Sequence, residues 1–142
     1  MGDGLIAEAM WRFAGAWPGW PGGGLGLEAL GKAPVAAMLQ QLSGTVVERR
    51  FVDGGFVGRW PFAIVVRVNG EETAGRLGAL EMIQGIRRWM ESEALPGIGQ
   101  GRLALCVEMT GLPSMAAAYP DGTEAYQAVF ALKYKEDGRY GG

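Results

Sequence analysis

The stretch RRFVDGGFVGRWPFAIVVRV, residues 49–68, predicts a β-hairpin at the centre of the chain. Strand-like runs over residues 45–52 and 59–68 flank a glycine-rich turn, Asp53-Gly54-Gly55. Alternate residues of the second run are apolar, which is the period of two expected of a strand with one buried face. The middle of the sequence therefore predicts a strand pair on which a sheet can be built.

The segments around this hairpin predict helices and a second strand pair. Apolar residues at helical spacing indicate an amphipathic helix before the hairpin and a longer one after it. The order helix, hairpin, helix, hairpin predicts an α+β fold, in which a mostly antiparallel sheet of about four strands packs against helices. The expected elements are helices at 5–13, 34–42 and 73–93, strands at 102–109 and 124–136, and a long loop at 110–122.

The length of 142 residues fits a single domain with a core of its own. We expect an N-terminal part over 1–44 with a helix, a Gly/Trp-rich loop and a short helix, then an α+β core over 45–135 and a flexible tail over 136–142. No apolar run reaches about 18 residues, and there is one cysteine, so a soluble cytoplasmic protein without a membrane span is expected. A net charge of −2 argues against nucleic-acid binding.

The motifs that suggest chemistry are incomplete. GLEALGKA, residues 26–33, has the spacing of a phosphate-binding loop but ends in alanine where a hydroxyl would hold magnesium. PGIGQGR, residues 96–102, has the glycines of a dinucleotide loop, but it follows a predicted helix and precedes a predicted strand, which reverses the required order. The chain has no histidine, and Cys106 in a predicted strand is typical of a small buried apolar residue. We therefore expect no cofactor, no metal and no enzyme; a small acid–base enzyme would need a deep pocket with two carboxylates of displaced pKa.

Large apolar side chains in predicted loops either mediate protein–protein contact or cap the ends of the sheet. Trp17 and Trp20 in AWPGWPGGGLG either fold back onto the core or contact a partner, and the tip of the hairpin is both apolar and basic. A projecting hairpin would offer rings to a neighbouring subunit and arginines to acidic groups. The candidate contact residues are Arg49, Arg50, Phe56, Val57, Arg59, Trp60, Met115 and Tyr119.

Over residues 45–134 the ordered pattern of the sequence resembles the tail terminator proteins of long-tailed bacteriophages, which are also labelled tail completion or minor capsid proteins. The stretches that carry the resemblance are FVDG, WPFAIVVRV, LGALEMIQGIRRWME, LPGIGQGR, LALCVEM and TGLPSMAAAYPDGTEAYQAVFALKY. The segment over 15–26 departs from the family pattern.

The resemblance implies a structural role in virion assembly and no catalytic residues. Members of this family are expected to form a ring, usually a hexamer, on the head-proximal end of the tail tube, in the host cytoplasm during assembly and then in the virion. The ring stops tube growth and presents a surface to the neck, so the implied partners are further copies of the chain, the tube protein and a neck or head-completion protein. A monomeric or dimeric head-completion protein or other adaptor is the alternative.

Overall fold

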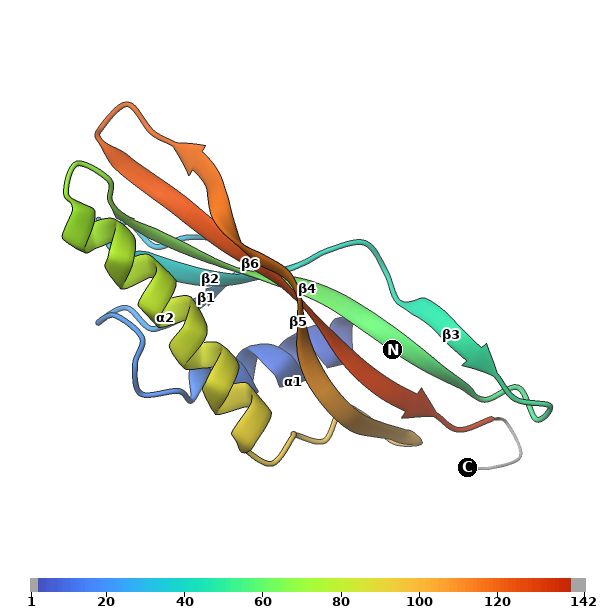
Figure 1. The fold of residues 1–142 in the computed structure, drawn as a ribbon. Coiled ribbons are helices and arrows are strands. Elements are labelled where there is room, and N and C mark those ends of the chain that lie inside the picture. Colours follow the sequence, from blue (N-terminus) through green and yellow to red (C-terminus); the bar gives the residue numbers. More distant parts are fainter. Residues whose placement is uncertain (1–2, 139–142) are drawn as a thin grey trace.

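The structure, a computed structural model, describes residues 3–138. Two helices and six strands are present in this range, and more of its residues lie in strands than in helices (Figure 1). In chain order they are α1 (Asp3–Gly15), β1 (Leu25–Leu27), β2 (Ala36–Gln41), β3 (Val46–Arg50), β4 (Phe56–Asn69), α2 (Thr73–Ser92), β5 (Arg102–Ala118) and β6 (Thr123–Glu136).

The strands form one mixed sheet in the order β1-β2-β4-β6-β5. β1 and β2 are parallel, whereas the other pairs are antiparallel. β2 and β3 share one edge of β4: β2 pairs with residues 62–67 and β3 with residues 56–59. β6 runs along the whole opposite edge of β4, and β5 lies beyond β6. At one end of the sheet the strand order is therefore β3-β4-β6-β5, as Figure 1 shows.

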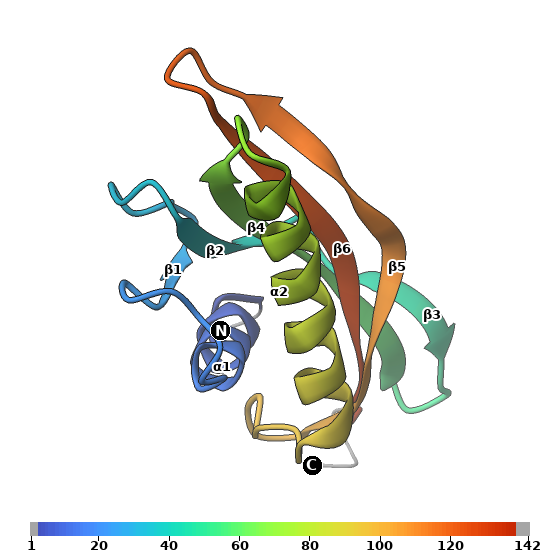
Figure 2. The same ribbon diagram turned by 60° about the vertical axis from the view of Figure 1, so that its left-hand side comes forward.

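Both helices lie on the same face of the curved sheet (Figure 2). The buried face of β4 and one side of each helix form the core. At the centre of this core the Phe62 ring stacks on the rings of Trp60 and Phe130, with centroid distances of 5.2 Å and 5.4 Å. Each large buried side chain contributes about 1.5–3 kcal/mol through removal from water. The helical members of this core are Ile6, Met10, Ala14, Ala79, Ile83, Ile86 and Met90.

The predicted α+β fold of about four antiparallel strands in the order helix, hairpin, helix, hairpin is wrong. The protein is β-rich, and its sheet has six strands and one parallel pair. The segment at 34–42 is β2 and not a helix, because its backbone pairs with the edge of β4 and Leu39 enters the core. The long loop predicted at 110–122 is mostly strand, since β5 continues to Ala118.

The structure confirms the predicted hairpin and the long helix, and it decides between the two alternatives for the tryptophan loop. The hairpin at 49–68 is confirmed as β3 and β4, and the helix predicted at 73–93 is confirmed as α2. Trp17 and Trp20 fold back onto the core, where their rings meet edge to face at 4.9 Å. Of the tail predicted over 136–142, residues 139–142 lie outside the described range, so its mobility stays a prediction.

Candidate functional site

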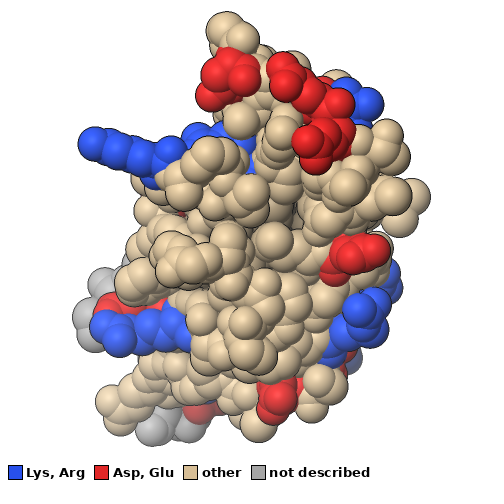
Figure 3. All heavy atoms as spheres, turned by 90° about the vertical axis from the view of Figure 1, so that its left-hand side faces the viewer, with Lys and Arg blue, Asp and Glu red and all other residues tan. Residues whose placement is uncertain are grey.

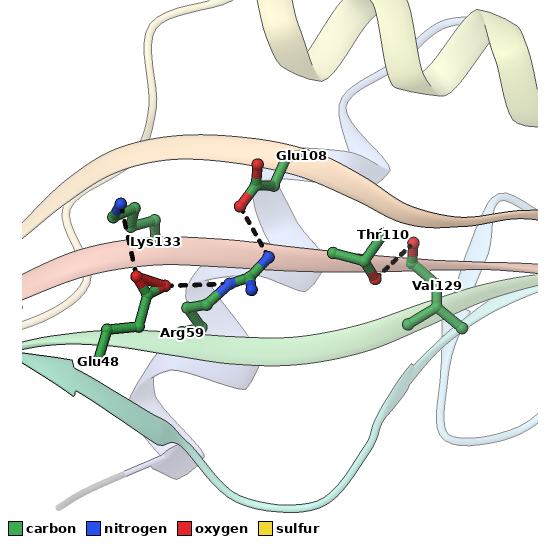
Figure 4. Close-up of polar contacts among 6 residues, drawn as sticks. All are labelled: Glu48, Arg59, Glu108, Thr110, Val129 and Lys133. Carbon is green, nitrogen blue, oxygen red and sulfur yellow. Dashed lines mark hydrogen bonds and ion pairs between the residues drawn. The ribbon is translucent and has the colours of Figure 1, made fainter.

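The end of the sheet where β3, β4, β6 and β5 lie side by side carries a network of ion pairs on the face that the helices leave bare (Figure 4). Arg59 on β4 lies 3.2 Å from Glu48 on β3 and 2.8 Å from Glu108 on β5. Lys133 on β6 lies 3.5 Å from Glu48. These side chains are 31–49% exposed, so each pair contributes at most about 1 kcal/mol. The network's role is to link four strands across this face.

The sequence-predicted contact residues separate into three groups. Arg49 and Arg50 on β3 are exposed, as are Met115 at 56% and Tyr119 at 40%. Residues of a second group already make contacts within the chain. Arg59 lies between two glutamates, and Phe56 and Val57 are half-buried. The Phe56 ring packs edge to face on Tyr134, with the ring centroids 6.0 Å apart.

Trp60 forms the third group by itself. Its side chain has no exposed surface and stacks on Phe62 in the core, so it is not available to a neighbouring subunit. The expectation that this residue sits at a projecting tip is therefore corrected. The reason is the strand period, since Trp60 shares the buried face with Phe62. Its indole Nε1 is buried without a hydrogen-bond partner.

Sequence reasoning named Met115 alone among the residues of β5 as a contact residue, and it missed the exposed edge of this strand. This strand has 17 residues and forms an edge of the sheet, and its pairing with β6 has register shifts at four places. The exposed fractions of its apolar side chains are large: 61% for Leu103, 43% for Leu105 and 82% for Leu112. An edge strand exposes backbone N–H and C=O groups that can pair with another chain, and apolar side chains strengthen such pairing. The signal that could have shown this was the row of apolar residues in the predicted strands on both sides of the loop expected at 110–122.

A groove of about 540 Å³ lies between the C-terminal end of α2 and the first half of β5. The helix contributes Glu91, and Glu93 follows directly after it; Ala104–Val107 form the strand side of the groove. Glu91 pairs with Arg87 at 3.2 Å on α2 itself. Grooves between a helix and an edge strand are a recurrent place for an added strand, since the strand supplies backbone hydrogen bonds and the groove accepts side chains.

Cys106 lies in the part of β5 that borders this groove, and it is exposed. The expectation that it is a buried apolar residue is therefore wrong, although its place in a strand is confirmed. The reason is its register: Cys106 pairs with Lys133, so it projects from the face that no helix covers. Val107, the next residue, projects toward the core and is 7% exposed.

Acidic residues gather at the opposite end of the molecule, where α2 begins and β5 turns into β6 (Figure 3). Glu124 accepts two hydrogen bonds of 3.0 Å from Arg76, and these bonds lower the pKa of its carboxyl. The hydroxyl and backbone N–H of Thr123 both donate to Asp121, and this lowers the pKa of Asp121. Because both pKa values are moved downward, both carboxylates are ionised at neutral pH, whereas a general acid needs a raised pKa.

The two glycine motifs have structural roles. In GLEALGKA the segment after β1 contains no helix, and its carbonyls at Gly31 and Ala33 accept hydrogen bonds from Arg67. A phosphate cradle instead directs N–H groups toward its ligand. PGIGQGR connects α2 to β5, as the sequence predicts, and Gly99 and Gly101 adopt φ of +120° and +77°. These values favour glycine.

Comparison with protein-family models finds no matching family, and comparison with curated proteins finds no match either. Among the described residues, 3–138, there is no group of three or more Cys, Asp or Glu side chains placed to hold a metal ion. Neither of the two helices in that range is long and apolar enough to cross a membrane.

Proposed function

We propose that this protein is a structural subunit of virion assembly of the tail-terminator type. In this role, copies of the chain form a ring on the end of a phage tail tube and join the tube to the neck. The protein would act in the host cytoplasm during assembly and remain in the virion tail. The stretches between residues 45 and 134 that resemble the tail terminator family support this assignment.

The observation that carries the proposal is the exposed edge of β5. A soluble chain normally protects such an edge with charges, a short strand or a covering element, since an open edge promotes association. β5 instead has 17 residues with Leu103, Leu112 and Met115 more than half exposed. An edge of this kind suits a subunit that is completed by its neighbours. When each subunit contacts the next through two different surfaces, a closed ring forms if the rotation between neighbouring subunits adds up to a full turn.

Light scattering of the purified protein across concentration, followed by negative-stain microscopy, tests the proposal. We expect closed rings of uniform subunit number, either for the protein alone or after the tail tube protein is added. Capped tubes of limited length in the mixture would support the terminator role. A protein that stays monomeric or dimeric at high concentration and leaves tube growth unchanged would refute it and favour the head-completion or adaptor role.

A further inference from the structure

Two edges of the sheet lack a strand partner at the same end of the molecule. Within residues 3–138, β3 pairs only with β4, and β5 pairs only with β6. Val46, Arg59, Lys133 and Cys106 form one row across the four strands, because each is the register partner of the next. The two ends of this row, Val46 and Cys106, are both exposed. The sheet can therefore be extended from either side at the same level.

The strand directions allow this extension by a second copy in the same orientation. β3, β4, β6 and β5 alternate in direction, since each neighbouring pair is antiparallel. In a second copy placed next to β5, the first strand would be β3, and it would run antiparallel to β5. The two copies would then present the same face of the sheet on the same side. This contact uses different surfaces on the two partners, so it can repeat around a ring.

The two edges carry one pair of opposite charges on the helix side, while Arg102, which lies on β5 in the same row as Arg50, already pairs with Glu136 at 2.8 Å. Arg50 is opposite Phe56, whose ring packs on the core residue Tyr134, so the Arg50 side chain projects on the helix side of β3. On the helix side of β5, Glu91 and Glu93 line the groove at the end of α2. Arg50 and Glu93 make no ion pair among the described residues. Pairing across the contact would bring these opposite charges together.

We propose that β5 and its groove at the end of α2 receive the β3 edge of a second copy of this chain, with Arg50 directed toward Glu93. The inference rests on the proposed self-assembling role and names the two surfaces that meet. It extends the four strands at this end of the sheet into the next subunit. The apolar side chains that β5 leaves exposed, Leu103 and Leu105, would be covered by the neighbouring strand.

Cross-linking tests the register. The Val46→Cys, Cys106→Ser variant carries one thiol on β3, and the natural chain carries one on β5, so a mixture can form a 46–106 link only between two molecules. A short bismaleimide covers a register offset of two residues, about 7 Å along a strand. We expect a mixed dimer on a denaturing gel, with the linked peptides identified by mass spectrometry. Val35→Cys, Cys106→Ser is the matched control, since Val35 is 40% exposed and belongs to neither edge.

Charge reversal tests the pair. Arg50→Glu and Glu93→Arg should each weaken self-association at least tenfold, because each places like charges at every contact. A mixture of the two single variants should recover assembly, since alternating subunits restore an opposite pair at both kinds of contact. The double variant should also assemble. Both positions are exposed, so circular dichroism should show unchanged folding.

The outcomes separate this interface from the proposed function. Rings that form without a 46–106 link above the Val35 control would overturn the interface and leave the assembly role standing. Rings of the single variants that are as stable as those of the natural protein would overturn the Arg50–Glu93 pair. Failure of the natural protein to assemble, with or without tube protein, would refute the proposed function itself.

Discussion

Two glycines in α2 offer a matched test of how the N-terminal loop is held. A Cβ atom at Gly85 would lie 2.7 Å from Cζ2 of Trp17, whereas a Cβ atom at Gly78 would have no heavy atom within 4 Å. Both glycines lie within the same 20-residue helix and are partly buried. The difference between their alanine variants therefore reports mainly on Trp17.

The magnitudes follow from two opposing effects. Alanine in place of glycine inside a helix is more favourable by about 0.5–1 kcal/mol, so Gly78→Ala should stabilise the protein by that amount. At Gly85 the same gain is opposed by displacement of the indole ring, and overpacking costs about 1–3 kcal/mol. We therefore expect Gly85→Ala to be destabilising by about 0–2 kcal/mol.

A double-mutant cycle isolates the contact. Trp17→Ala should lower stability by itself, but in that background Gly85→Ala should become stabilising, like Gly78→Ala. The coupling free energy between positions 17 and 85 should be about 1–3 kcal/mol. Urea unfolding followed by far-ultraviolet circular dichroism gives each value without relying on tryptophan fluorescence. A coupling below about 0.5 kcal/mol would show that Trp17 does not pack over Gly85 in solution.

Three further perturbations test other parts of the structure. Trp60→Ala should lower the free energy of unfolding by about 3–5 kcal/mol, as expected for a core ring, and a change below about 1 kcal/mol would contradict its burial. Arg76→Gln should destabilise at neutral pH, and the difference from the natural protein should shrink as pH falls below the unfolded glutamate pKa of about 4.3 and vanish below the lower folded pKa of Glu124. The reason is that Arg76 lowers the folded pKa of Glu124, so its contribution is present above the unfolded pKa and is lost as pH falls; a difference that persists in acid would contradict this. Arg59→Gln removes two ion pairs, so it should cost at most about 2 kcal/mol, and less at high salt; a loss above about 3 kcal/mol would show that the pairs with Glu48 and Glu108 are more buried than described.

The sequence by itself determined the elements whose periodicity is strong and local. Along α2, the buried residues Ala79, Ile83, Ile86 and Met90 recur at the helical period. Along β4, alternate residues from Trp60 to Val68 belong to the core under the helices, although Ala63 and Val65 on the other face are buried as well. Both periods can be read from the sequence alone. The turn at Asp53-Gly54-Gly55 is likewise local, since the carboxylate of Asp53 accepts a hydrogen bond from the N–H of Gly55 and Gly54 adopts φ of +92°.

Only the tertiary structure decided the features that depend on distant partners. The segment 36–41 becomes a strand because the edge of β4 pairs with it, which overrides its helical pattern. β5 continues through Gly111 and Pro113 because β6 lies beside it along its whole length. The placement of Arg50 and Glu93 near opposite edges of one sheet also follows from the strand order. No local feature of the sequence indicates that order. Composition therefore predicted a surface for partners, and the strand order is the basis of our proposal that it lies on the edges of the sheet.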